Sequence, residues 1–219
     1  MAPLLELRDA GAGYAGRPVL RGITLSLRTG ERVAVLGRSG SGKSTLLGLL
    51  YARLAGHAAL VPQAAALVRT LSVFHNVYMG RLDRHSTWHN LRMLAWPARA
   101  EVAAVAATLA SVGLADKLFA RAGTLSGGQQ QRASVARALY NGRRIVIGDE
   151  PVSALDPVQA AGILRLLGER HETLVLAMHD VALALAFADR IIVLDAGRLV
   201  LDAPATGLRA RPHAVLCLT

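Results

Sequence analysis

Cysteine is almost absent from this sequence, because Cys217 is the only one among 219 residues. A single thiol excludes an internal disulfide and fits a reducing compartment. Aromatic residues are also scarce, at 4% against 53% for all hydrophobic residues, so the core must consist mainly of Leu, Val, Ile and Ala. No uncharged apolar run reaches the roughly 20 residues that a transmembrane helix needs. We therefore expect a cytoplasmic protein with an aliphatic core.

Acidic residues are outnumbered, at 15 against 25 Lys and Arg, which gives a formal net charge of +10. Such a charge favours polyanions: nucleotides, nucleic acids or an anionic membrane face. Almost all of these basic residues are arginines, since Lys43 and Lys117 are the only lysines. A genome-wide codon bias would produce the same preference for arginine over lysine. The arginines are scattered, with no dense basic run and no interleaved aromatics. We therefore expect no nucleic-acid partner.

The hydrophobic pattern predicts strands that alternate with helices in the second half of the chain. Strands are expected at 4–8, 19–27, 31–36, 57–61, 144–147, 173–178 and 190–194. Helices are expected at 42–54, 126–140, 157–170 and 181–188. This alternation favours an α/β fold with a mostly parallel, covered sheet. The length suits one domain, residues 1–219, with an inserted helical subdomain at about 68–119, where Val102, Val105 and Leu109 form an amphipathic stripe.

A glycine-rich segment follows the expected strand 31–36. Residues 37–45 read GRSGSGKST, which matches G-x-x-x-x-G-K-[ST] in its required setting between a strand and a helix. The backbone N–H groups of such a loop surround phosphate oxygens, Lys43 reaches the β- and γ-phosphates, and Ser44 offers a hydroxyl to Mg²⁺. The predicted phosphate cradle consists of Gly37, Arg38, Ser39, Gly40, Ser41, Gly42, Lys43, Ser44 and Thr45.

Polar side chains suited to phosphate chemistry follow three of the expected strands. Residues 144–150 read RIVIGDE, so an apolar strand delivers Asp149 and Glu150 at its carboxyl end, where α/β proteins bind ligands. Asp149 is expected to hold Mg²⁺, often through water, which leaves Glu150 free to act as general base. Gln63 and His179 follow two other strands, and a Gln can orient a water and sense the γ-phosphate. We predict catalytic roles for Glu150, His179 and Gln63, and metal binding by Ser44, Gln63 and Asp149.

A second glycine-rich turn lies about ninety residues beyond the first. Residues 124–139 read TLSGGQQQRASVARAL, so Ser126, Gly127 and Gly128 stand at the start of an expected helix. Free N–H groups at a helix N-terminus also suit an anion. The residues therefore indicate two anion cradles in one small domain.

Taken together, these motifs resemble those of the ATPase subunits of ABC transporters. They come in that family's order and cover nearly the whole chain: Tyr14 before the second strand, GRSGSGKST, Gln63 in VPQ, the signature LSGGQ at 125–129, IVIGDEP, the SALD turn at 153–156, and His179. The resemblance implies a P-loop NTPase sheet domain with an antiparallel β subdomain and an inserted helical subdomain. It also implies ATP and Mg²⁺ as cofactors.

The resemblance accounts for the second cradle. In this family two subunits sandwich two ATP molecules head to tail, and each ATP contacts the P-loop of one chain and the signature turn of the other. A second copy of this chain is therefore an expected partner. By resemblance, further ATP contacts fall to Leu125, Ser126, Gly127, Gly128 and Gln129 across the dimer, to Asp156 at the dimer seam, to Tyr14 stacked on adenine, and to His179 at the γ-phosphate.

The chain most resembles the importers within this family. It lacks the acidic-glycine motif of exporters before LSGGQ, and no membrane domain is fused to it, which implies separate integral membrane permease subunits. The segments LVRTLSVFHNVYMGRL, STW and DEPVSALDP are similar to those of phosphonate importers. We expect a peripheral protein on the inner face of the membrane, whose system includes an extracytoplasmic solute-binding protein.

One departure and two rival interpretations remain. Lys43 and Gln63 are only 20 positions apart, so strands usual for the antiparallel β subdomain are missing and this subdomain should be reduced. The first rival is a cytoplasmic ABC-type ATPase without a permease, acting in repair or regulation. The second is a P-loop kinase, which LSGGQ and the Asp149–Glu150 pair disfavour. The genes adjacent to this one would separate the importer from the first rival.

Overall fold

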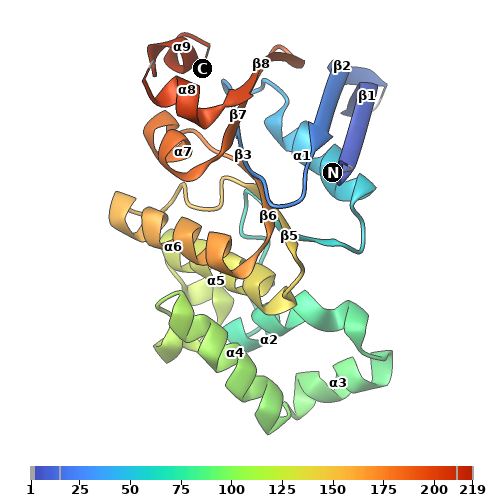
Figure 1. Cartoon of the computed structure of the whole chain (residues 1–219). Coiled ribbons are helices and arrows are strands. Elements are labelled where there is room, and N and C mark those ends of the chain that lie inside the picture. Colours follow the sequence, from blue (N-terminus) through green and yellow to red (C-terminus); the bar gives the residue numbers. More distant parts are fainter. Residues whose placement is uncertain (1–2, 15, 211, 219) are drawn as a thin grey trace.

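The computed structural model describes residues 3–14, 16–210 and 212–218 (Figure 1). Its main sheet consists of β3 (Arg32–Leu36), β4 (Ala58–Val61), β5 (Ile145–Asp149), β6 (Thr173–Ala177), β7 (Arg190–Asp195) and β8 (Arg198–Pro204). The order is β4–β5–β6–β3–β7–β8, and all neighbours pair in parallel except β7 and β8. The predicted mostly parallel sheet is therefore confirmed.

Alternate residues of the parallel strands pack into two cores, one on each face of the sheet. In β3, Ala34 and Leu36 belong to one core, whereas Val33 and Val35 belong to the other. Helices α5 (Gly127–Asn141), α6 (Pro157–Arg170) and α7 (Val181–Phe187) cover the first face, and α1 (Lys43–Arg53) covers the second (Figure 1). Burial on both faces explains why these strands are continuous apolar runs in the sequence.

A separate two-stranded antiparallel sheet packs beside α1. It consists of β1 (Leu5–Tyr14) and β2 (Arg17–Leu27). The strand predicted at 4–8 is therefore too short, because the pairing continues to Tyr14 through register shifts. Those irregularities break the two-residue alternation beyond Arg8, and Asp9 has a φ of 47°. The predicted reduction of the antiparallel region is confirmed, since α1 and β4 are joined by residues 54–57 alone.

Short helices gather at the end of the molecule away from β1 and β2 (Figure 1). They are α2 (Val73–Tyr78), η1 (Met79–Arg84), α3 (Thr87–Ala95), α4 (Arg99–Ser111), η2 (Ala115–Lys117) and η3 (Ala122–Thr124). Val105 and Leu109 of the expected amphipathic stripe are fully buried, and Val102 packs against the same core. The division of 68–119 as a subdomain stays a prediction.

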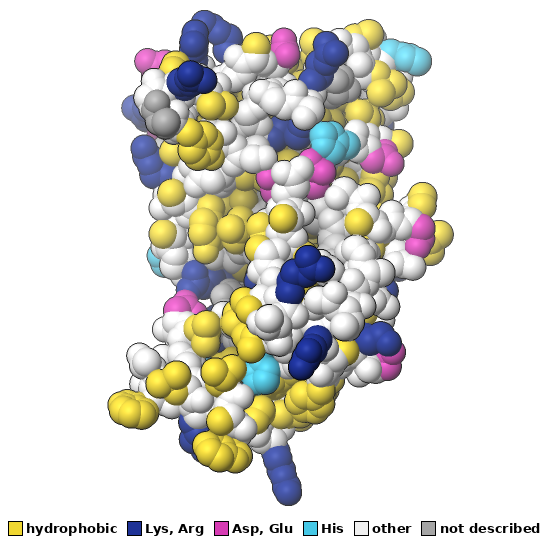
Figure 2. Space-filling view, turned by 180° about the vertical axis from the view of Figure 1, so that it is seen from behind, with side chains coloured by type: hydrophobic (Ala, Val, Ile, Leu, Met, Phe, Trp, Pro, Cys, Tyr) yellow, Lys and Arg dark blue, Asp and Glu magenta, His cyan; other side chains and the backbone are white. Residues whose placement is uncertain are grey.

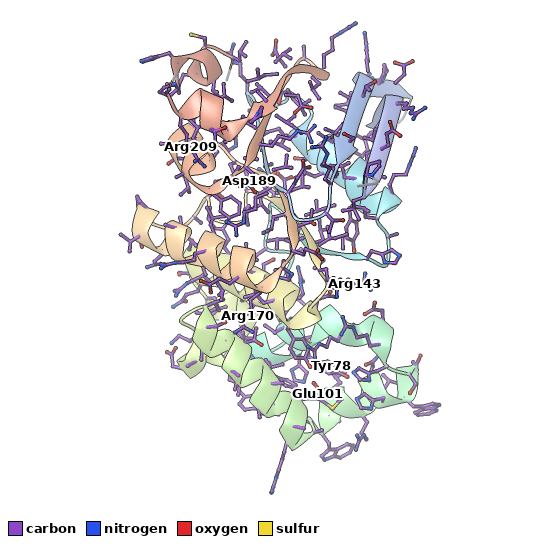
Figure 3. The ribbon with its side chains drawn as sticks, in the orientation of Figure 1. Tyr78, Glu101, Arg143, Arg170, Asp189 and Arg209 are labelled. Carbon is purple, nitrogen blue, oxygen red and sulfur yellow. The ribbon has the colours of Figure 1, made fainter. Side chains whose placement is uncertain are left out.

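Tyr140 joins this helical end to α5. Its hydroxyl donates a hydrogen bond to the carboxylate of Glu101 in α4, and its ring lies 6.4 Å from that of Tyr78 in α2. Figure 3 labels Glu101 and Tyr78 at the helical end of the molecule. Burial raises the pKa of both tyrosines, and Glu101 raises the pKa of Tyr140 further. Helix α5 therefore links the helical end to the sheet through buried contacts.

Three elements near the C-terminus were not predicted from the sequence: β8, α8 (Ala205–Arg209) and α9 (His213–Leu216). The edge strand β8 alternates between half-buried and exposed side chains and contains Asp202 and Pro204, so it has none of the apolar continuity of the central strands. In the described parts of the chain, no helix is both long and apolar enough to cross a membrane. Lys and Arg side chains are spread over the face shown in Figure 2 rather than gathered in one patch.

Candidate active site

The loop 37–45 joins β3 to α1, as the sequence predicts. Gly37 has a φ of 143°, and a Cβ there would lie 2.2 Å from the carbonyl oxygen of Leu194. Gly42 has a φ of 105° and forms the N-cap of α1. Residues with a Cβ rarely adopt such angles, so both positions require glycine. The loop therefore turns sharply just before the N-terminus of α1, a position where the helix favours an anion.

The side chain of Lys43 is hydrogen-bonded to the start of the same loop. Its Nζ atom donates hydrogen bonds to the carbonyl oxygens of Gly37, at 2.7 Å, and Arg38, at 3.2 Å, and the residue is only 5% exposed. Burial lowers the pKa of Lys43, whereas the negative charges of Glu150 and Asp149 act in the opposite direction. A buried cation beside two carboxylates can exchange its loop carbonyls for phosphate oxygens.

A cavity of about 370 Å³ opens in front of this loop. It is lined by Val19, Ser39, Gly40, Gly42, Lys43, Ser44, Thr45, Gln63, Glu150 and His179. The structure thus brings together the loop, one residue of β2 and three of the predicted catalytic side chains. Gly37, Arg38 and Ser41 belong to the loop but do not line the cavity. Larger cavities of about 560 and 690 Å³ lie elsewhere and contain none of these three side chains.

Three neighbouring strands deliver the predicted catalytic residues. Gln63 follows β4, Glu150 follows β5 and His179 follows β6, and these strands are adjacent and parallel. Their carboxyl ends therefore meet at one edge of the sheet. Nε2 of His179 lies 2.6 Å and Nε2 of Gln63 lies 3.2 Å from the same atom, Oε1 of Glu150. Because a carboxylate only accepts, both nitrogens act as donors toward Glu150.

Asp149 is the last residue of β5 and is only 8% exposed. Its Oδ1 atom is buried and has no hydrogen-bond partner among the described residues. A buried carboxylate oxygen without a donor is costly unless a cation or ordered water satisfies it. Ser44 is the second residue of α1 and lines the cavity at Lys43. These two side chains, with the oxygen of Gln63, are the hard oxygen ligands that Mg²⁺ prefers.

The signature residues form the N-terminus of α5. Oγ of Ser126 accepts from the N–H of Gln129 at 3.3 Å, and Oε1 of Gln129 accepts from the N–H of Ser126 at 2.9 Å, which makes a capping box. The box leaves the first helical N–H groups, those of Gly127 and Gly128, without a partner inside the helix. Leu125 is buried and anchors the turn. None of these residues lines the cavity at Lys43, so the two cradles are separate within one chain.

Two other predicted ATP contacts lie outside the cavity. Asp156 is the N-cap of α6, and its Oδ1 accepts from the N–H groups of Val158, at 3.1 Å, and Gln159, at 3.0 Å. Tyr14 ends β1 with 65% of its surface exposed and does not line the cavity. Within one chain, the structure therefore brings neither residue to the loop 37–45.

Gln131 was missed by the sequence reasoning. It is buried in α5, and its amide contacts the carbonyl oxygen of Glu150 and the backbone N–H of Ala154. The available signal was the run of three glutamines in LSGGQQQR, of which only Gln129 was counted as a site residue. Val19 was also missed, since an apolar strand residue carries no chemical signal in a sequence.

Comparison with known proteins shows the family. Residues 20–153 match the model of the ABC transporter family. The phosphonates import ATP-binding protein PhnC of Caulobacter vibrioides is 35% identical over 94% of this chain and 90% of its own length. PhnC of Anaeromyxobacter dehalogenans is 39% identical over 95% of this chain, but this chain spans only 47% of that relative's length.

Solved structures agree on the fold. MJ0796, a bacterial ABC transporter cassette solved as a dimer, has a TM-score of 0.79 at 25% identity, with 91% of this chain and 98% of that chain covered. The cbiO1 protein of Clostridium perfringens, part of the cbiONQ complex, has a TM-score of 0.74 at 24% identity, with 99% and 94% covered. These likenesses confirm the expected P-loop NTPase architecture. The repair or regulatory alternative gains no support from the relatives.

The family model and the curated relatives both match this chain. The same chain contains the loop 37–45, the contacts of Gln63 and His179 with Glu150, and the signature turn at the start of α5. The protein belongs to the ABC transporter family, as one of its ATP-binding and ATP-hydrolysing proteins.

Proposed function

We propose that this chain powers the import of phosphonate-like solutes by hydrolysing ATP for separate membrane permease subunits. The observation that carries the ATPase assignment is the meeting of Gln63 and His179 on one oxygen of Glu150, beside the loop that holds Lys43. The solute class is supported by the names of the PhnC relatives. A kinase would need a second substrate site at this cavity, and LSGGQ would have no role in it.

Nucleotide binding begins at the loop 37–45. The triphosphate lies in the cavity, where backbone N–H groups and the buried cation of Lys43 offset its charge. Mg²⁺ fits the site because Oδ1 of Asp149 is buried and has no donor in the part of the chain that the structure describes. Ser44, Asp149 and Gln63 would hold the ion, which neutralises charge on the β- and γ-phosphates when bound.

Hydrolysis depends on Glu150 as general base. Gln63 and His179 both donate to Oε1, which leaves Oε2 as the oxygen that accepts a proton from the attacking water. His179 also holds the carboxylate in one orientation and lies where it contacts the γ-phosphate. A base must be held within hydrogen-bond reach of its water, and two donors on one oxygen restrict its rotation accordingly.

A complete site needs a second copy of the chain. The free N–H groups of Gly127 and Gly128, with the hydroxyl of Ser126, suit the γ-phosphate of ATP held by the other copy's P-loop. In this arrangement Leu125 and Gln129 shape the signature turn, and Asp156 lies at the dimer seam. Tyr14, exposed at the end of β1, stacks on the adenine.

The remaining partners belong to the transport system. Permease subunits bind the chain at the inner face of the cell membrane, and the chain is peripheral to that membrane. An extracytoplasmic solute-binding protein supplies the phosphonate-like solute. These partners are proposed from the import function named for the relatives.

The test is the variant Glu150→Gln in the purified chain. A neutral amide cannot take a proton from water, so steady-state hydrolysis should fall by about 100-fold or more while ATP binding persists. The trapped ATP should hold a dimer together, which size-exclusion chromatography would detect. Glu172→Gln is the matched control, because Glu172 pairs weakly with Arg144 on the surface at the other end of the strands. Normal turnover by Glu150→Gln would refute the assignment.

A further inference from the structure

Gln131 ties the signature helix to the peptide that follows Glu150. The residue lies in the second turn of α5 and is 7% exposed. Its Nε2 donates to the carbonyl oxygen of Glu150, at 2.6 Å, and to Oγ of Ser153, at 3.1 Å. Its Oε1 accepts from the N–H of Ala154 at 2.8 Å. Both ends of this buried amide are therefore engaged by one turn of chain, residues 150–154.

That turn begins with an uncommon backbone conformation. Glu150 has a φ of 54°, in the left-handed region that residues with a Cβ seldom adopt. Its N–H donates to the carbonyl oxygen of Ala177 in β6 at 3.1 Å. Its carbonyl oxygen accepts from Gln131 and, at 3.2 Å, from Oγ of Ser153. The peptide before Glu150 is thus hydrogen-bonded to the sheet, and the peptide after it is hydrogen-bonded to α5. Together these two contacts set the direction of the Glu150 side chain.

The signature turn itself packs on the same segment. A Cβ at Gly128 would lie 3.0 Å from the carbonyl oxygen of Ala154 and 3.3 Å from the side chain of Leu155. The first turn of α5 and the turn after Glu150 are therefore in direct contact, with Gln131 as the polar link. A shift of α5 would change the geometry at Glu150 because packed elements move together.

We propose that Gln131 is a positioning residue that orients Glu150 and makes this orientation depend on the placement of the signature helix. The inference rests on the proposed function, in which Glu150 is the base and the signature turn binds ATP held by a second copy. ATP engaged by the signature turn then stabilises the placement of α5 in which Gln131 holds Glu150 of the same chain.

Two variants test the role. Gln131→Leu removes all three contacts, and a misplaced base should lower kcat by about 100-fold while ATP affinity and KM change little. Gln131→Glu keeps the shape and the acceptor toward Ala154, but an ionised carboxylate cannot donate to the carbonyl oxygen of Glu150. Lowering the pH from about 8 to about 6 protonates that buried carboxyl and should restore part of kcat. Activity is expressed relative to the unchanged chain at each pH, so that the pH dependence of the unchanged chain is removed from the comparison.

Ser134→Ala is the control for a purely structural loss. Ser134 is fully buried on the same helix, its hydroxyl lies 3.5 Å from the guanidinium of Arg137, and among the described residues it makes no hydrogen bond to the turn 150–154. The inference is overturned if the Gln131 variants retain the kcat of the Ser134→Ala chain, or if they lose ATP affinity along with kcat. If Gln131→Leu does not fold, the pH response of Gln131→Glu decides alone, and a constant ratio overturns the inference. Failure of the proposed function is distinct, because the unchanged chain would then lack turnover or Glu150→Gln would keep it.

Discussion

Nε2 of His179 lies 2.6 Å from Oε1 of Glu150, although the two residues are 29 positions apart in the chain. Glu150 is nearly buried, with 12% of its side chain exposed, whereas His179 is about half exposed at 51%. The histidine is therefore much more accessible to solvent than the carboxylate, although both line the cavity. It can hold the carboxylate while its ring remains accessible to a bound phosphate.

Replacing His179 should lower turnover without removing nucleotide binding. His179→Ala leaves Gln63 as the remaining side-chain donor to Oε1, so kcat should fall by about 100-fold, the typical contribution of a positioned acid–base group. His179→Gln retains a side-chain donor and should keep more activity than the alanine variant. Steady-state ATPase assays measure both, with the exposed His57→Ala as control. An alanine variant as active as that control would exclude a role for the histidine in catalysis.

Lys43→Ala should weaken ATP binding and abolish activity. The variant removes a buried cation that the phosphates need, and a charged hydrogen bond of this kind contributes about 1.5–3 kcal/mol, or roughly 10- to 100-fold in affinity. Equilibrium titration with a fluorescent ATP analogue measures the change. Lys117→Ala is a matched control, because Lys117 pairs with Asp116 at 2.7 Å on the surface. Equal affinities in the two variants would show that the loop 37–45 does not cradle phosphate.

Ser126→Arg should separate the two cradles. The added side chain would block closure of the signature turn over the other copy's ATP, so hydrolysis should fall by orders of magnitude while a single chain still binds ATP normally. Ser111→Arg places the same side chain at the exposed end of α4 and should change neither property. The two-chain arrangement is wrong if Ser126→Arg weakens ATP binding as much as Lys43→Ala does.

His171 should make stability depend on pH. It is 5% exposed, its Nδ1 lies 2.6 Å from the carbonyl oxygen of Arg143, and its Nε2 has no partner among the described residues. Burial, with a smaller effect of Arg170, lowers the pKa of His171, although the Arg143 carbonyl opposes this shift. The unfolded chain therefore binds the proton more readily. The resulting contribution to stability is complete above the ordinary histidine pKa of about 6.5 and is lost as the pH falls below it.

Urea denaturation at several pH values measures this dependence. His171→Leu should remove the His171 contribution to the decline below about pH 6.5, at a cost of about 1 kcal/mol at pH 8 for the lost hydrogen bond. His213→Leu is the control, since His213 is exposed in α9. A decline of the same size in the His171→Leu chain would assign it to other groups.

The local chemistry of the site was readable from the sequence. The loop 37–45 and the acidic pair after β5 depend on short-range patterns, because glycine angles, helix starts and strand ends are set by neighbouring residues. Helix α6 was placed correctly, since Asp156 followed by Pro157 is a strong helix start. The end of β1 was placed too early and β8 was missed, because bulges and half-exposed edges weaken the two-residue period.

Local patterns in the chain were enough to identify the residues that we propose for nucleotide binding: the glycine loop, Lys43, Asp149, Glu150 and the turn at Ser126. The folded chain was needed to show that Gln63 and His179 meet at one oxygen of Glu150, because this meeting depends on β4, β5 and β6 being neighbours. The same is true of the link from Gln131 to Glu150, which joins residues 19 positions apart in the chain. Strand order and helix packing arise from the burial of whole faces, and no local motif encodes them.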